Sequence, residues 1–265
     1  MSVDVADRPA TAAFHREMIS VNGVKVELLT AGEGEPLVFW HGAGTLGGWD
    51  FALPWAKRFR VMIPLHPGWG GSDDGTHMTS IQDYVMHNLE LLDQLGLQRI
   101  NLVGLSMGGW MAAAFASQHS HRLHKLVLCA PAGLKVPEHP SADIFRIKPE
   151  SILHELSENI QVLLPYLPKT ADDLDFIVER YRESTSFARL AWERMDDPKL
   201  ARWLHRIAVP TLLAWGESDR IIPFGQAKTW ASLIPHATIR SFAGAGHLLL
   251  NERPDAVAAI GDFLS

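Results

Sequence analysis

The sequence has little cysteine, no long apolar runs and no excess of positive charge, and each scarcity excludes a class of protein. Cys129 is the single cysteine among 265 residues, so no intramolecular disulfide can form. No stretch approaches about 18 consecutive apolar residues, which excludes a transmembrane helix. The chain has 24 Lys and Arg residues and 30 Asp and Glu residues. This acidic balance argues against a nucleic-acid-binding protein, because binding of phosphates requires clustered basic side chains. We therefore expect no nucleic-acid partner and no membrane partner.

The first residues are polar and do not look like a targeting segment. Residues 1–13 lack the apolar stretch of a secretory signal, and together with the single cysteine this predicts a cytoplasmic location. We expect residues 1–14 to form a loosely held arm. Cys129 stands in the apolar run 126–130, which indicates a buried structural thiol rather than a nucleophile.

Short apolar runs alternate with helical periods along most of the chain. Asn22-Gly23 between two apolar stretches predicts a hairpin of residues 17–21 and 24–30. The later apolar runs show no alternation, which indicates strands covered on both faces of a mostly parallel, doubly wound α/β sheet. The predicted strands are 36–40, 60–65, 99–105, 125–130, 209–215 and 237–242, and the predicted helices are 80–95, 107–118, 224–233 and 254–264.

One segment does not follow this alternation of strands and helices. Residues 134–205 contain six prolines and several helical stretches but no run that reads as a strand. We interpret this segment as a helical cap inserted over the sheet. The predicted core is then residues 1–133 together with residues 206–265, and the length suits one large core with a small insertion.

Ser106 is the candidate nucleophile. It stands in Gly104-Leu105-Ser106-Met107-Gly108, after an apolar strand and before an apolar helix. The tight turn between strand and helix requires small flanking residues, and it lifts the serine hydroxyl above the carboxyl edge of the sheet. The pattern differs from the glycine-rich loops that bind mononucleotides or dinucleotides.

A serine needs a base to remove its proton, and the base needs an acid to hold it. His247 follows a predicted strand near the chain end and is flanked by glycines, so a loop can present its imidazole into a cleft. Asp219 follows the strand 209–215 and lies on a loop at the same edge of the sheet. Glu217, two residues earlier, is the fallback acid.

Two backbone N–H groups are expected to bind the oxyanion. Met107, directly after the serine, supplies one from the start of a helix. The loop 41–44 after the strand 36–40 supplies the other, with Ala43 as the first candidate and Gly44 as the next. We interpret His41 as a brace for this loop.

No metal site or cofactor is expected. His119, His121 and His124 lie close together in sequence, but no cysteine or carboxylate completes a ligand set. The chemistry of a serine, a histidine and an aspartate requires no cofactor.

The four motifs together resemble the α/β-hydrolase fold family, in its group with a helical cap. They are the loop 41–44, Pro67-Gly68-Trp69-Gly70-Gly71-Ser72, the turn around Ser106, and the two loops of Asp219 and His247. Their order of serine, aspartate and histidine is the one that this family uses. The chain departs from the family at His66, where an aspartate is common before Pro-Gly.

The resemblance implies a serine hydrolase that forms an acyl-enzyme, with a small-molecule substrate and homo-oligomerisation left open. The main reading is hydrolysis of a small to medium, largely apolar carboxylic ester. A C–C bond hydrolase or lactonase of aromatic degradation is the alternative, although Leu105 and Leu248 replace the polar and aromatic residues that such C–C hydrolases usually carry. A triad-bearing ligand receptor with little turnover is the alternative from another class.

The cap is expected to select the substrate. Its arginines are expected mostly to face solvent, but one of them could enter the pocket and bind a carboxylate; they are Arg180, Arg182, Arg189, Arg194 and Arg202. The candidate pocket residues from core and cap are Gly44, Leu105, Trp110, Phe145, Tyr166, Trp192 and Leu248.

Overall fold

The computed structural model describes residues 13–170 and 172–265. The predicted N-terminal arm, 1–14, lies outside this range except for its last two residues. Of these, Phe14 is buried against the core rather than loosely held. No helix in the described part of the chain is long and apolar enough to cross a membrane.

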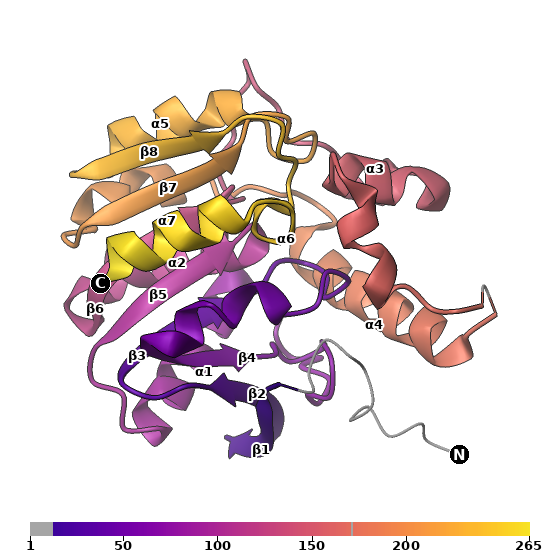
Figure 1. The fold of residues 1–265 in the computed structure, drawn as a ribbon. Helices are drawn as coiled ribbons and strands as arrows, with labels where there is room; N and C mark the ends of the chain where they lie inside the picture. The colour runs from indigo at the N-terminus through magenta and orange to yellow at the C-terminus, as the bar shows by residue number, and fades with distance from the viewer. Residues whose placement is uncertain (1–12, 171) are drawn as a thin grey trace.

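An eight-stranded sheet forms the centre of the molecule (Figure 1). Its order is β1-β2-β4-β3-β5-β6-β7-β8. β1 pairs antiparallel with β2 and β2 antiparallel with β4, while every later pair is parallel. The mostly parallel sheet predicted from the apolar runs is therefore confirmed. The strands are β1 (His15–Val21), β2 (Val24–Ala31), β3 (Glu35–Trp40), β4 (Phe59–Pro64), β5 (Ile100–Leu105), β6 (Leu123–Cys129), β7 (Thr211–Gly216) and β8 (Ala237–Phe242).

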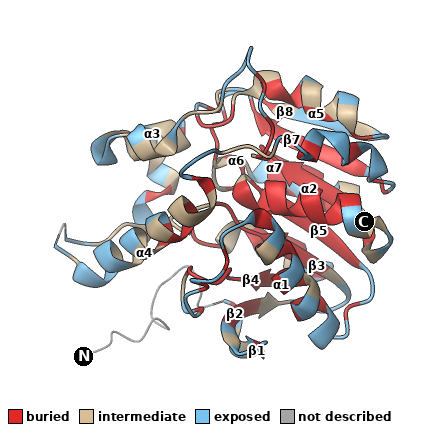
Figure 2. Ribbon diagram, turned by 180° about the vertical axis from the view of Figure 1, so that it is seen from behind, coloured by how far each residue is buried: buried red, intermediate tan, exposed pale blue. Residues whose placement is uncertain are grey.

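Helices cover both faces of the sheet, as the continuous apolar strands indicate. One core cluster joins the sheet to α1 (Ile81–Gln94), α2 (Met107–His119) and α5 (Ala227–Leu233). A second cluster, on the other face, contains α7 (Pro254–Leu264). Figure 2 shows that the buried residues are concentrated in the central strands and in α2. The predicted helix 224–233 is shorter than expected, because residues 224–226 form a 3₁₀ turn after Pro223.

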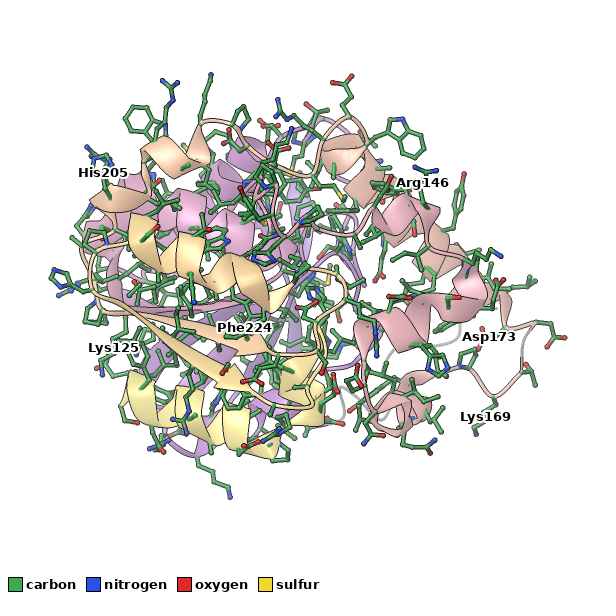
Figure 3. All side chains as sticks on the ribbon, turned by 90° about the horizontal axis from the view of Figure 1, so that it is seen from above. Lys125, Arg146, Lys169, Asp173, His205 and Phe224 are labelled. Carbon is green, nitrogen blue, oxygen red and sulfur yellow. The ribbon has the colours of Figure 1, made fainter. Side chains whose placement is uncertain are left out.

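The segment between β6 and β7 has the helical character that the sequence predicts. It contains α3 (Ile152–Leu156), α4 (Leu174–Ala191) and several 3₁₀ turns. Among its described residues the one β interaction is an isolated bridge between Gly133 and Asp196. α3 and α4 lie together at one side of the sheet (Figure 1), and Arg146, Lys169 and Asp173 mark this side in the view from above (Figure 3). We refer to residues 134–205 as the cap segment.

The strand order reverses at β3, because the chain adds β4 on one side of this strand and later returns to add β5 on the other. β4 lies on one side of β3 and β5 on the other, so the loops after β3 and β5 diverge from adjacent strand ends. Trp40 and Gly104, near those ends, are register partners. Ligands of parallel α/β sheets bind at such a switch point, and this is where the predicted nucleophile and oxyanion loop meet.

Candidate active site

Ser106 lies in a strained turn between β5 and α2. Its φ of 57° and ψ of −116° are sparsely populated for a residue with a side chain. The turn requires glycine on both sides: a Cβ at Gly104 would lie 2.4 Å from the Gly108 oxygen, and a Cβ at Gly108 would lie 2.1 Å from the Trp40 oxygen. The N–H of Ser106 donates to the Cys129 carbonyl at 2.9 Å, which fixes the turn to the neighbouring strand.

His247 and Asp219 form a buried pair. Nδ1 of His247 lies 2.8 Å from Oδ2 of Asp219, and both side chains are almost fully enclosed. The other carboxylate oxygen accepts the backbone N–H groups of Ile221 and Ile222 at 2.9 and 2.8 Å. Three donors therefore hold the Asp219 carboxylate with one oxygen toward the imidazole.

Glu217 is placed differently from Asp219. It is exposed, and its Oε1 accepts the hydroxyl of Ser241 at 2.7 Å. The two acids that the sequence leaves as alternatives thus face opposite environments, and Asp219 is the one against the histidine.

The hydroxyl of Ser106 is half-buried and makes no hydrogen bond to any described residue. In proteins without substrate, the bond between nucleophile and base is often long or poorly aligned. The Ser106 residue as a whole is partly exposed.

The loop after β3 lies directly against Ser106. A Cβ at Gly42 would lie 3.2 Å from the Cβ of Ser106, so this loop and the turn after β5 are in close contact. The indole N–H of Trp69 donates to the Ala43 carbonyl at 2.9 Å, which fixes the Ala43 peptide. Among the described residues, the N–H groups of Ala43 and Met107 have no acceptor outside regular secondary structure.

His41 and His66 brace this loop from below. His41 donates through Nδ1 to the Gly42 carbonyl at 2.7 Å and accepts the His66 N–H at Nε2 at 2.9 Å. Burial lowers the pKa of His41 to about 4, so the ring is neutral. The ring of His66 lies against that of His41, with ring centroids 4.1 Å apart and the ring planes inclined by 37°.

A buried acid from the cap segment, Glu183, contacts the far end of the same loop. Its carboxylate accepts the hydroxyl of Thr45 at 2.5 Å and the Thr45 N–H at 3.4 Å. Arg180, one turn earlier on α4, donates to Thr45 Oγ1 at 2.9 Å. Sequence reasoning missed Glu183; the available signal was an acid four residues before the buried Phe187, on the inward face of α4.

The predicted pocket residues lie in several places. Gly44 is exposed beside Thr45, Leu105 is buried at the end of β5, and Leu248 donates its N–H to the Leu156 carbonyl of the cap at 3.0 Å. Tyr166 donates its hydroxyl to Asp50 at 3.1 Å.

Three of the predicted aromatic pocket residues differ in burial and contacts. Trp110 is buried in the core with its ring against Gly133. Phe145 stacks on Phe187, with ring centroids 5.5 Å apart. Trp192 lies against Phe145 but is 71% exposed, because the outer face of α4 points to solvent.

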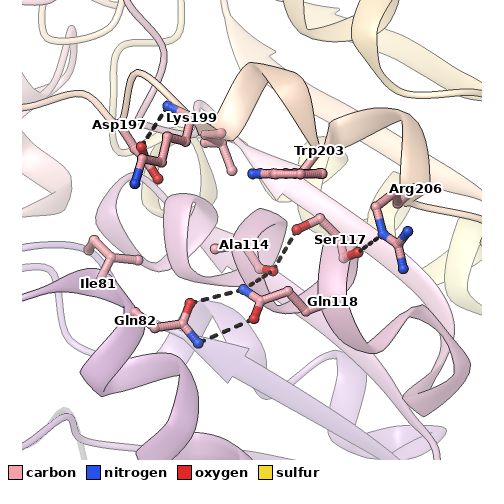
Figure 4. Close-up of a pocket in the computed structure, with 10 residues that line it drawn as sticks. Ile81, Gln82, Ala114, Ser117, Gln118, Asp197, Lys199, Trp203 and Arg206 are labelled. Carbon is pink, nitrogen blue, oxygen red and sulfur yellow. Dashed lines mark hydrogen bonds between the residues drawn. The ribbon is translucent and has the colours of Figure 1, made fainter.

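A cavity of about 620 Å³ opens on another part of the surface (Figure 4). Its floor includes Ala114, Ser117 and Gln118, from the end of α2 that is remote from Ser106. At 1.5 Å rise per residue, Ser117 is about 16 Å along the helix from Ser106. Gln82 and Gln118, which line this cavity, hydrogen-bond to each other, and none of Ser106, Asp219 and His247 lines it.

Outside this site, the described residues include neither a metal-binding group nor a reactive cysteine. The part of the chain that the structure describes contains no group of three or more His, Cys, Asp or Glu that could hold a metal ion. Cys129 is fully buried, and burial raises the pKa of its thiol, which keeps it protonated.

Comparison with known proteins finds hydrolases that are similar to this chain over most of its length. Residues 37–260 match the family model described as the alpha/beta hydrolase family. The chain is 28% identical to 2-hydroxy-6-oxononadienedioate/2-hydroxy-6-oxononatrienedioate hydrolase of Comamonas testosteroni, over 92% of this chain and 93% of that one. It is also 28% identical to 2-hydroxy-6-oxo-6-phenylhexa-2,4-dienoate hydrolase of Burkholderia cepacia, with the same coverage.

Solved structures show the same fold. A bacterial membrane phospholipase A superposes with a TM-score of 0.81 at 23% identity, over 97% of this chain and 88% of that one. At that identity the likeness concerns the fold alone. The family match spans most of the chain and includes the strands β4 to β8 and all but the first two residues of β3. The chain therefore belongs to the alpha/beta hydrolase family.

Proposed function

We propose that the protein is a serine hydrolase in which Ser106 is the nucleophile, His247 the general base and Asp219 the acid that orients it. The Asp219–His247 hydrogen bond and the strained turn at Ser106, which follow parallel strands that end at the same edge of the sheet, carry this proposal. The carboxylate fixes the imidazole with its proton on Nδ1, which leaves Nε2 able to accept the serine proton. The N–H groups of Ala43 and Met107 stabilise the oxyanion.

The relatives support the C–C hydrolase alternative better than the ester that the sequence favours. Their names describe hydrolases of 2-hydroxy-6-oxo-dienoates. We propose that the substrate is of this class: a chain with a carboxylate at one end and a ketone next to the bond that breaks.

The same three residues can perform this reaction. The substrate first takes its 2-oxo form by losing the proton of its 2-hydroxyl group and gaining one at C5. Ser106 then attacks the C6 carbonyl while His247 takes the hydroxyl proton. The C5–C6 bond breaks, its electron pair is delocalised to the 2-oxo group, and His247 returns the proton to the dienol product. Water activated by His247 releases the acid from Ser106.

Ester hydrolysis is the second candidate, and the residues beside the nucleophile and base support it. Leu105 and Leu248 are both apolar, so they offer no polar group to the dienol. An ester requires only the triad and the oxyanion hole, because its alkoxide or phenoxide leaving group needs no delocalisation.

The two candidates are separated by comparing substrates. We would measure kcat/KM for 2-hydroxy-6-oxo-6-phenylhexa-2,4-dienoate, by loss of its absorbance and release of benzoate, and for 4-nitrophenyl butyrate. Higher kcat/KM for the dienoate is expected. Turnover of the ester alone would assign the protein to ester hydrolysis instead.

Ser106→Ala is the control for both substrates. It should lower kcat by roughly 10⁴-fold or more and abolish labelling by a fluorophosphonate. Labelling of a different serine, identified by mass spectrometry, would show that the nucleophile is assigned wrongly.

A further inference from the structure

Glu183, Arg180 and Thr45 form a connected polar group between the cap and the loop beside Ser106. Oε1 of Glu183 accepts from Thr45 Oγ1 at 2.5 Å and from Arg180 Nη2 at 3.0 Å. Oε2 lies 2.8 Å from Arg180 Nη1. Arg180 Nη2 also lies 3.3 Å from the carboxylate of Glu179. The single guanidinium therefore contacts two carboxylates.

This group lies next to the proposed oxyanion loop. Thr45 follows Ala43 by two residues, and a Cβ at Gly44 would lie 3.8 Å from Glu183 Oε2. The Glu183 side chain is only 4% exposed, while that of Arg180 is 23% exposed. Nε of Arg180 is buried without an acceptor in the described part of the chain. The guanidinium is thus partly exposed, and its charge is already balanced by the two carboxylates.

The charges of Arg180, Glu179 and Glu183 determine whether an anionic substrate group can bind next to them. With Glu179 and Glu183 both ionised, the group carries one positive and two negative charges. A substrate carboxylate that approaches Arg180 meets this net negative charge in a partly desolvated place, where like charges repel strongly. Protonation of Glu183 removes the repulsion and releases the guanidinium.

We propose that Glu183 is a specificity-determining residue, which holds Arg180 and Thr45 and makes the binding of a carboxylate-bearing substrate depend on uptake of one proton at Glu183. The inference rests on the proposed serine-hydrolase function and refines its substrate class. Glu183 acts through Arg180 and touches no reacting atom, so it is a positioning residue.

Glu183 changes its charge near neutral pH. Burial raises its pKa to about 7, against the lowering effects of Arg180 and of the Thr45 hydrogen bond, and Glu179 adds to the rise. The charged groups that face it are Arg180 and Glu179 on α4, and the core side presents the uncharged Thr45. Below pH 7 the neutral acid favours carboxylate substrates, and above pH 7 the ionised form disfavours them.

A pair of esters tests the proposal. The neutral 4-nitrophenyl butyrate and the anionic mono-4-nitrophenyl glutarate differ by one terminal carboxylate. The ratio of their kcat/KM values cancels the titration of His247, which both esters share. We expect the ratio of anionic to neutral ester to fall about tenfold between pH 6 and pH 8.

Glu183→Gln should remove this pH dependence and raise the ratio at pH 8 about tenfold, because glutamine keeps an acceptor for Thr45 but no charge. Asp175→Asn removes an equal charge from an exposed position on the same helix and should leave the pH dependence of the ratio in place. A ratio that is flat with pH in the unaltered protein would overturn the proposal, while ester turnover by Ser106 would still support the hydrolase.

Binding provides a readout that does not depend on turnover. Isothermal titration of Ser106→Ala with 2-hydroxy-6-oxo-6-phenylhexa-2,4-dienoate should give a Kd about tenfold lower at pH 6 than at pH 8. The double variant with Glu183→Gln should lose this difference, which separates Glu183 from any titration of the ligand or of His247. Equal pH dependence in both proteins, or no binding in either, would contradict the role of Glu183.

Discussion

His247 and Asp219 meet through one defined contact, with Nδ1 2.8 Å from Oδ2, while Oδ1 is occupied by the N–H groups of Ile221 and Ile222. The backbone donors leave the carboxylate no freedom to turn away from the imidazole. Because only Oδ2 remains for the histidine, the tautomer with the proton on Nδ1 is favoured, and Nε2 is available as a base.

Asp219→Asn should therefore reduce kcat by about 10³ to 10⁴-fold while the protein remains folded. The amide can donate to Nδ1 and so favours the wrong tautomer. Glu217→Gln is the matched control, since this exposed acid bonds only to Ser241 and its loss should cost little. Steady-state kinetics with circular dichroism as a folding check would measure both. A larger loss in Glu217→Gln would show that the acid lies two residues earlier.

Much of this fold could be predicted from local patterns in the sequence. The apolar runs before Ser106 and before Asp219 are continuous because both faces of β5 and β7 are covered, and both strands were predicted to within two residues of their bounds. The glycines around Ser106 indicate the tight turn for the reason that the structure shows: no Cβ fits against Trp40 or Gly108.

Contacts made by the cap could not be predicted in this way. Helical periodicity does not say which face of α4 meets the core, so Trp192 was predicted to line the pocket although its ring is largely exposed. The contact of Glu183 with Thr45 joins residues 138 positions apart, and although the position of Glu183 on α4 indicates an inward-facing acid, no local pattern identifies Thr45 as its partner. The substrate class likewise depends on these long-range contacts.

Gly108→Ala should destabilise the serine turn. The new Cβ would lie 2.1 Å from the backbone oxygen of Trp40, so β3 or α2 must shift, at a cost of about 1–3 kcal/mol or more. We expect a lower Tm and loss of fluorophosphonate labelling. Gly44→Ala is the control for stability, since its Cβ would make only an ordinary contact of 3.8 Å with Glu183. Equal Tm values for the two variants would contradict the close approach.

Dialysis against EDTA should leave the activity unchanged. The proposed mechanism uses a side-chain nucleophile, a base and backbone donors, and none of these steps assigns a role to a metal. Ester turnover measured before and after dialysis, with the dialysis buffer as control, tests this. A loss of activity that zinc restores would contradict the serine-hydrolase mechanism.

The last prediction concerns the buried His66 and the stability of the protein in acid. Burial lowers its pKa well below the ordinary value of 6.5, and neither ring nitrogen has a hydrogen-bond partner among the described residues. The folded protein therefore keeps His66 neutral while the unfolded chain protonates it, so this contribution to stability is full above pH 6.5 and is lost progressively as the pH falls. His66→Leu removes the titrating group, so its free energy of unfolding, measured with urea, should fall less between pH 8 and pH 5 than that of the unaltered protein. His205→Leu, at an exposed position, should keep the original dependence. If His66→Leu loses as much stability in acid as the unaltered protein, His66 is not held neutral by the fold, and other groups cause the acid sensitivity.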